Sequence, residues 1–325
     1  MTIFLGACSS EVSVKAPVSL TVNEGITDPL GFHDATPSFS WKLVDSRQGA
    51  KQTAYQITAS APDAENTVLW DSGKVVSRQS VYVPYEGSTL QSRQRVVWKV
   101  RYWDQEDKVS GWSDTAVIEL GLLANTAWQA EWIHAVKPDA TKKADCTSDC
   151  VTEKRLAHTA NPATYLRKTF QLDAAPEKAR LYLTARGLVD FRINGQLVTP
   201  NAFLPGWTDY KQKIETLTYD VTGLLEQGEN VLAARITDGW YAGDISKRVY
   251  GKIPELLAQL EMTSSTGELR TVMTDASWAH STNGAITMAA IWHGEDYDAR
   301  KELTGWDIAK LCRGRPVRAC VCNGS

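Results

Sequence analysis

Residues 96–103 read Val-Val-Trp-Lys-Val-Arg-Tyr-Trp, and this run indicates how the first part of the chain folds. The even positions are all apolar, whereas the odd positions include Lys99 and Arg101. Successive side chains of a strand point to opposite faces, so the run predicts a strand with one buried and one wetter face. Similar short runs recur at 38–43, 54–59, 80–83 and 116–120. Together they predict a fibronectin type III-like or immunoglobulin-like sandwich over residues 11–124.

Residues 125–304 repeat this pattern on a larger scale. Asn194-Gly195 is a strong signal for a two-residue hairpin, because both residues tolerate positive φ. Eight or more strands with a long connection predict a jelly-roll β-sandwich, which makes the whole chain all-β. The strand candidates are residues 164–170, 178–185, 190–193, 215–219, 230–237, 256–262, 269–273 and 286–291.

Length and composition limit the function classes. A chain of 325 residues has room for roughly two domains. The 35 basic and 38 acidic residues nearly balance, so nucleic acid is not an expected partner. The twelve tryptophans are the compositional outlier, and they allow two interpretations. Each ring either anchors a sandwich core or offers a flat face on which a sugar stacks.

Both ends of the chain differ from the parts between them. Leu5-Gly-Ala-Cys8 resembles the lipobox of bacterial lipoproteins, so residues 1–10 are interpreted as a truncated lipoprotein signal. This predicts lipidation of Cys8, anchoring to a membrane, and export to the periplasm or outer membrane. Residues 305–325 form an irregular tail that ends in a basic, Cys-rich stretch. A shifted reading frame or a natural disordered tail would explain it.

Cys146 and Cys150 lie four positions apart in a long polar loop over residues 135–162. In an oxidising compartment they are predicted to form a small disulfide. A metal site is less favoured, because no second Cys pair or nearby His completes four ligands.

Several strings of the chain stand in a distinctive order. They include Pro37-Ser-Phe-Ser-Trp41, Trp128-Gln-Ala-Glu-Trp-Ile133, Leu204-Pro-Gly-Trp-Thr-Asp-Tyr210, Asp238-Gly-Trp-Tyr241 and Gly294-Glu-Asp-Tyr-Asp-Ala-Arg300. In their order and spacing they resemble the non-catalytic N-terminal part of bacterial α-L-rhamnosidases, a glycoside hydrolase family, over about residues 35–306. In that family the catalytic carboxylates lie downstream on a helical barrel, so the resemblance assigns no catalytic residue here and implies a truncated protein.

The resemblance also implies a function for the second domain, because some members use it to bind L-rhamnose with a calcium ion. We therefore expect a carbohydrate-binding surface for rhamnose-containing glycans or glycosides. Asn201 is a candidate calcium ligand, but Pro200 offers no carboxylate, and Asp209 or Asp244 would have to compensate. The candidate sugar contacts are Asn201, Trp207, Asp209, Tyr210, Trp240, Tyr241 and Asp244.

Two alternatives stay open. The β-domains could hold an active site of their own, for which Asp209, Asp238 and Glu295 are the weak candidates, since crowded carboxylates can supply a general acid. The chain could instead be a structural fragment that packs on a catalytic barrel, which an exposed apolar patch would favour. A polar concavity with an aromatic floor around residues 201–210 and 238–244 would favour binding.

Overall fold

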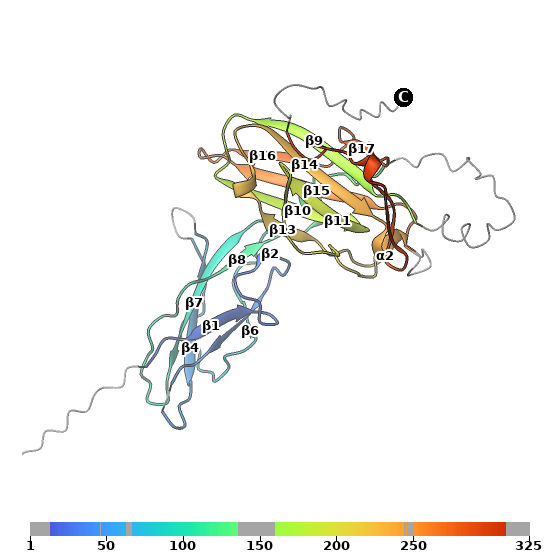
Figure 1. Ribbon diagram of the computed structural model, residues 1–325. Helices are drawn as coiled ribbons and strands as arrows, with labels where there is room; N and C mark the ends of the chain where they lie inside the picture. Colours follow the sequence, from blue (N-terminus) through green and yellow to red (C-terminus); the bar gives the residue numbers. More distant parts are fainter. Residues whose placement is uncertain are drawn as a thin grey trace, which may run out of the picture. The chain divides into compact units, whose positions relative to one another are not determined.

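The computed structural model describes residues 14–45, 47–62, 67–135, 160–243, 245 and 250–309. The predicted all-β fold is confirmed, since the described elements are strands apart from short helical turns such as α2, Gly239–Ala242. The chain divides into two compact units, the first ending at Ala127 and the second beginning at Trp128 (Figure 1). No helix in the described part of the chain has the length and apolar content that a membrane crossing requires.

The first unit contains a five-stranded sheet in the order β2-β8-β7-β4-β5 and a three-stranded sheet in the order β1-β3-β6. The pairings are antiparallel except for β2 with β8, which is parallel. The strands are β1 Val18–Val22, β2 Leu30–Phe32, β3 Ser38–Lys42, β4 Ala54–Ser60, β5 Val68–Asp71, β6 Val83–Pro84, β7 Arg95–Trp103 and β8 Ala116–Leu120.

The alternation in residues 96–103 is confirmed as the two faces of β7. Val96, Trp98, Val100 and Tyr102 are buried, and the residues between them are partly or fully exposed. The Trp98 ring packs against Phe39 with centroids 4.3 Å apart. Trp98 lies on β7 of the five-stranded sheet and Phe39 on β3 of the three-stranded sheet, so burial of this ring pair helps to hold the two sheets together.

A partly buried ion cluster joins Asp45 and Arg47 to Asp104, which directly follows β7. Arg47 Nη2 lies 2.6 Å from Asp45 Oδ2 and 2.7 Å from Asp104 Oδ2. The other oxygen of Asp104 accepts hydrogen bonds from the backbone N–H of Glu106 and Lys108. Hydrogen bonds from Arg47 hold the pKa of Asp45 at about 2. Burial alone would raise the pKa of Asp104, but the bonds from Arg47 and the two backbone donors lower it.

This cluster predicts how the first unit responds to acid. A carboxylate whose pKa is lowered by folding stabilises the fold above its unfolded pKa of about 4, and that stabilisation is lost as the pH falls toward 2. We therefore expect Asp45→Asn to lower the free energy of unfolding at pH 7, with the difference from the unchanged protein vanishing near pH 2. Urea unfolding across this pH range measures it. The exposed Glu24→Gln serves as the control, and a deficit of Asp45→Asn that persisted at pH 2 would contradict the assignment.

The second unit contains a four-stranded sheet in the order β13-β10-β15-β16 and a five-stranded sheet in the order β12-β11-β14-β9-β17, with a separate β18-β19 hairpin. All pairings are antiparallel. The strands are β9 Thr164–Leu172, β10 Lys178–Arg186, β11 Leu188–Ile193, β12 Gln196–Leu197, β13 Leu217–Asp220, β14 Gly228–Thr237, β15 Glu255–Thr263, β16 Leu269–Met273, β17 Ala279–Ser281, β18 Ile286–Ala290 and β19 Gly294–Tyr297.

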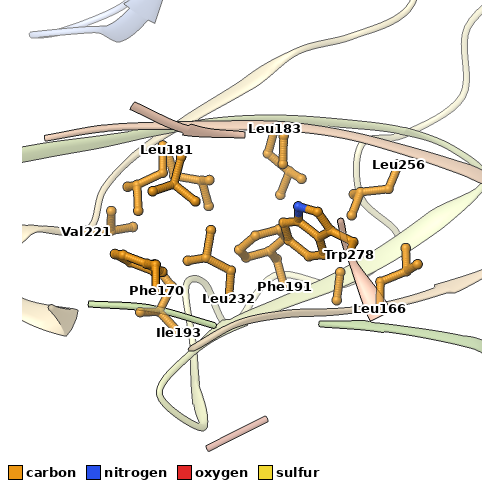
Figure 2. Packing of buried hydrophobic residues seen from close by; sticks show 14 of the residues in the cluster. Leu166, Phe170, Leu181, Leu183, Phe191, Ile193, Val221, Leu232, Leu256 and Trp278 are labelled. Atoms are coloured by element: carbon orange, nitrogen blue, oxygen red, sulfur yellow. The ribbon is translucent and has the colours of Figure 1, made fainter. Parts of the chain in front are cut away.

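The two sheets of this unit enclose one apolar core. Figure 2 shows Leu181 and Leu183 facing Phe170, Phe191 and Leu232 across it. A β-sandwich is therefore confirmed, and its narrower interpretation as a jelly roll stays a prediction. The Asn194-Gly195 hairpin is also confirmed, with φ of 51° and 82° and Ile193 paired to Gln196.

The segment after the last strand, β19, packs back against strands β9 and β11 of the same unit. The Trp306 ring meets Tyr165 edge to face at 5.0 Å, and Asp307 Oδ2 lies 3.7 Å from Arg192 Nη1. Arg167 donates a hydrogen bond to the carbonyl oxygen of Ile308. The first residues of the predicted irregular tail thus pack on the outer face of the sheet that contains β9 and β11.

Candidate functional site

The loop from Thr199 to Tyr210 carries most of the side chains that the sequence singles out. Asn201 and Asp209 are exposed on it. Trp207 is 61% exposed and Phe203 62%. Asp209 organises the local turn, because its carbonyl accepts hydrogen bonds from the N–H groups of Gln212 and Lys213. The loop therefore presents an amide, a carboxylate and two large rings to solvent.

A cavity of about 560 Å³ lies beside this loop, within the second unit. It brings together Asn201 and Glu295, which belong to distant parts of the sequence. Its polar lining is Asp190, Thr199, Asn201, Arg235, Thr237 and Glu295. Its aliphatic lining includes Val198, Leu204, Ile286, Ala289, Ala290 and Ile291. Polar groups thus lie within a largely aliphatic wall.

Two charged side chains that line the cavity, Asp190 and Arg235, belong to a network with the neighbouring Arg192. Arg235 Nη2 donates to Asp190 Oδ2 at 2.8 Å, and the two residues are direct partners across β11 and β14. Arg192 Nη2 also donates to Asp190 Oδ2, at 3.3 Å, and Arg192 Nε lies 3.2 Å from Asp190 Oδ1. Two guanidinium groups therefore share one carboxylate, and Asp190 is paired rather than free.

Tyr210 and Tyr241 meet in an aromatic cluster rather than on a free surface. Tyr210 is buried, and its ring contacts Tyr241 at 5.3 Å and Tyr250 at 5.2 Å. Its hydroxyl donates to the carbonyl oxygen of Gly206. Burial, together with the neighbouring Tyr250, raises the pKa of Tyr210 to about 12. These contacts make Tyr210 a support for the loop that carries Trp207.

Trp240 and Asp238 lie at α2 but have different surroundings. The half-buried Trp240 packs against Phe203 with ring centroids 6.1 Å apart, so α2 supports the exposed loop. Asp238 is fully buried. Its carboxylate accepts two hydrogen bonds from Asn161, at 2.8 Å from the backbone N–H and 2.5 Å from the side-chain amide. A substrate would have no access to Asp238 in this arrangement.

Several predicted positions lie outside the described residues. These are Asp244, the disulfide pair Cys146 and Cys150, and the lipidation candidate Cys8.

The described residues do not fit a calcium site at Asn201. Ca²⁺ takes six to eight oxygen ligands with carboxylates among them. Within the part of the chain that the structure describes, no group of three or more His, Cys, Asp or Glu residues could hold a metal ion. Asn201 is exposed, and the preceding Pro200 has no side-chain donor.

Reasoning from the sequence missed two charged residues that line the cavity, Asp190 and Arg235. Both fall within predicted strands, and both carry a charge at a position that points away from the core. The signal available in the sequence was the alternation within these strands, which places both charged side chains on the outer face of the sheet. Phe203 was also missed as a candidate, although it lies within the Phe-Leu-Pro-Gly-Trp string.

Comparisons with protein families identify both units. Residues 17–124 match the family described as Rha78A-like, N-terminal immunoglobulin domain. Residues 174–322 match the α-L-rhamnosidase N-terminal domain.

Curated relatives agree with these matches. The chain is 41% identical over 307 residues to an α-L-rhamnosidase of Formosa agariphila, covering 92% of this chain and 32% of the relative. It is 40% identical over 316 residues to an α-L-rhamnosidase of Alteromonas sp., and this match covers 94% of this chain and 33% of the relative. The chain therefore spans about a third of the length of these relatives.

Solved structures show the same relationship. The α-L-rhamnosidase of Streptomyces avermitilis, solved in complex with L-rhamnose, matches with a TM-score of 0.79 at 25% identity, covering 90% of this chain and 43% of that one. The α-L-rhamnosidase of Dictyoglumus thermophilum matches with a TM-score of 0.77 at 30% identity, and this match covers 90% of this chain and 32% of that one. Through its immunoglobulin domain and its α-L-rhamnosidase N-terminal domain, the chain belongs to the α-L-rhamnosidase family.

Proposed function

We propose that the second unit binds carbohydrate, namely rhamnose-containing glycans or glycosides, at the loop from Thr199 to Tyr210. The observation that carries the proposal is the exposure of Phe203 and Trp207, 62% and 61%, on the same loop as the exposed Asn201 and Asp209. Leaving two large rings in water forgoes the free energy of burying them. Sugar sites combine such rings, which stack on C–H faces, with a few polar groups that fix the hydroxyls.

The relatives support this assignment. The Streptomyces avermitilis α-L-rhamnosidase that resembles this chain was solved with L-rhamnose. The packing around the loop supports it as well. Phe203 of the loop packs against Trp240, and Tyr210 at its end packs against Tyr241 and Tyr250, so these ring contacts hold the loop in place. A loop fixed in this way presents its polar groups without a large loss of conformational entropy on binding.

Replacing Trp207 by alanine tests the proposal. We expect calorimetric titration of the full chain with L-rhamnose to show binding that Trp207→Ala weakens about tenfold, which corresponds to about 1.4 kcal/mol. The matched control is Tyr82→Ala, which removes a 59% exposed ring from the first unit and should leave the affinity unchanged. Binding that is absent from the unchanged chain, or equal in Trp207→Ala, would contradict the proposal.

The same samples examine the alternative of an active site within the β-domains. An aryl α-L-rhamnoside is incubated with the chain, and release of the aryl group is followed. We expect no turnover, because Asp238 is fully buried and Asp190 is held by two guanidinium groups. Turnover that persists through repurification and disappears in Glu295→Ala would favour the hydrolase instead. Repeating the titration with a chelator shows whether any binding depends on calcium.

A further inference from the structure

An asparagine followed by glycine is chemically labile, and the described residues contain two such pairs, Asn194-Gly195 and Asn283-Gly284. The backbone nitrogen of the glycine can attack the amide carbon of the asparagine side chain, because glycine has no Cβ to hinder the close approach. The reaction requires a side-chain amide that can turn toward this nitrogen and a backbone N–H that is not engaged elsewhere. The structure gives the two pairs opposite surroundings.

The side chain of Asn194 is held on both of its polar atoms. Its Nδ2 donates hydrogen bonds to the carbonyl oxygen of Leu224 at 3.0 Å and to Asn230 Oδ1 at 2.8 Å, and its Oδ1 accepts one from the N–H of Val231 at 2.8 Å. Turning the amide toward Gly195 would break all three of these bonds. The packing of the hairpin therefore protects this asparagine.

Asn283 is exposed in the bend between β17 and β18. Its backbone N–H donates to Ser281 Oγ at 3.1 Å, but its side-chain amide makes no hydrogen bond to any described residue. The N–H of Gly284 likewise donates to no group in the described part of the chain. The amide can therefore turn, and the nitrogen beside it is not engaged.

We propose that Asn283 is a site of spontaneous deamidation in the folded protein and that Asn194 is not. The Gly284 nitrogen forms a bond to Asn283 Cγ and gives up its proton, while the Cγ–Nδ2 bond breaks and Nδ2 leaves with that proton as ammonia. Water then opens the resulting succinimide ring. Attack of water at Cγ yields aspartate, and attack at the main-chain carbonyl yields isoaspartate, in which the main chain runs through the former side chain.

Isoaspartate at position 283 would disturb the packing of the second unit, because it inserts an extra carbon into the main chain before Gly284. Gly284 lies directly against Tyr165, and an added Cβ there would overlap the Tyr165 ring. Tyr165 is buried in a cluster with Ile286, and Trp306 packs on its ring. A displaced Gly284 must move either this ring or the start of β18, so we expect the isoaspartyl chain to unfold at a lower urea concentration.

The experiment incubates the full chain in mildly alkaline buffer and digests samples with trypsin over time. The peptides 271–300 and 193–211 separate the two asparagines, and mass spectrometry follows the conversion of each amide into a carboxylate. Fragment ions distinguish Asn194 from Asn201 in the second peptide. We expect Asn283 to react at least about tenfold faster than Asn194, which corresponds to a difference of about 1.4 kcal/mol in the barrier.

The same incubation in urea shows whether the fold causes this difference. In the unfolded chain we expect Asn194 and Asn283 to react at similar rates, because the hydrogen bonds that protect Asn194 are then lost. Equal rates in the folded chain, a faster reaction at Asn194, or a reaction at Asn283 that occurs only in urea would each overturn the inference.

Asn283→Gln is the matched control for the effect on stability. It keeps a side-chain amide, but the longer side chain closes a ring far more slowly. We expect it to keep its urea midpoint through the incubation, whereas the midpoint of the unchanged chain falls as isoaspartate accumulates, measured by enzymatic methylation of isoaspartyl groups. An equal fall in both chains would overturn the effect on packing, because the loss of stability would then come from another position.

Discussion

Asp238→Ala is expected to lower the free energy of unfolding of the second unit by about 2 kcal/mol, since a hydrogen bond to a charged group contributes roughly 1.5–3 kcal/mol. The carboxylate is fully buried and accepts both the backbone N–H and the side-chain amide of Asn161. Removing it leaves these donors without that acceptor. Asn161 is 77 positions away in the sequence, so the bond also ties the start of β9 to α2. Urea unfolding followed by circular dichroism measures the change.

The matched control for this variant is Asp209→Ala. Asp209 is exposed, and we expect its replacement to change stability by no more than about 0.5 kcal/mol. A small loss of stability in Asp238→Ala, comparable with that of the control, would contradict the structural role. The comparison separates two carboxylates that the sequence alone places in the same class.

Trp98→Ala is expected to lower the free energy of unfolding of the first unit by about 3–5 kcal/mol, the usual cost of removing a buried large aromatic side chain. Trp98 is 1% exposed and packs against Phe39, which is also completely buried. Its removal leaves a cavity between the two sheets. In urea, we expect the transition of the first unit to move to lower concentration.

Trp292→Ala is the control for Trp98, because its ring is 68% exposed on the turn between β18 and β19. We expect a change within about 0.5 kcal/mol. Equal effects of the two variants would mean that Trp98 does not anchor the core. Asp238→Ala and Trp98→Ala act on different units, so together they assign any two transitions seen in urea.

The sequence predicts strands well where side chains alternate or where an apolar run is long. The predicted strand over residues 116–120 is β8, and the run at 96–103 is β7. The strand β19 was missed, because Gly294–Tyr297 is exposed throughout and contains no buried position. Its strand conformation comes from pairing with β18. The propensities of the four residues themselves do not reveal that pairing. The three-residue strand β2 was missed for a similar reason, since it pairs with β8 from a distant part of the chain.

The candidate site was less accessible to sequence reasoning, because it depends on register and on distant loops. Asp190 and Arg235 meet because they are partners in the β11–β14 register, which the sequence does not specify. Asn201 and Glu295 line one cavity because the β18–β19 hairpin lies beside the loop. Tyr210 and Trp207 are three positions apart in one string, yet one is buried and the other exposed. From the sequence alone, both Tyr210 and Trp207 were candidate sugar contacts.

The segment after β19 has a practical consequence for dissecting this protein. A shortened chain that ends at Tyr297, the last strand residue, would remove Trp306 from Tyr165, Asp307 from Arg192 and the carbonyl acceptor of Arg167. The sheet face beneath would then be exposed to solvent, and Arg167 would lose its hydrogen bond to Ile308, whereas Arg192 would keep its pairing with Asp190. Expression boundaries for the isolated second unit therefore belong beyond Ile308, and a cut at the end of the last strand would yield a less stable, more aggregation-prone fragment.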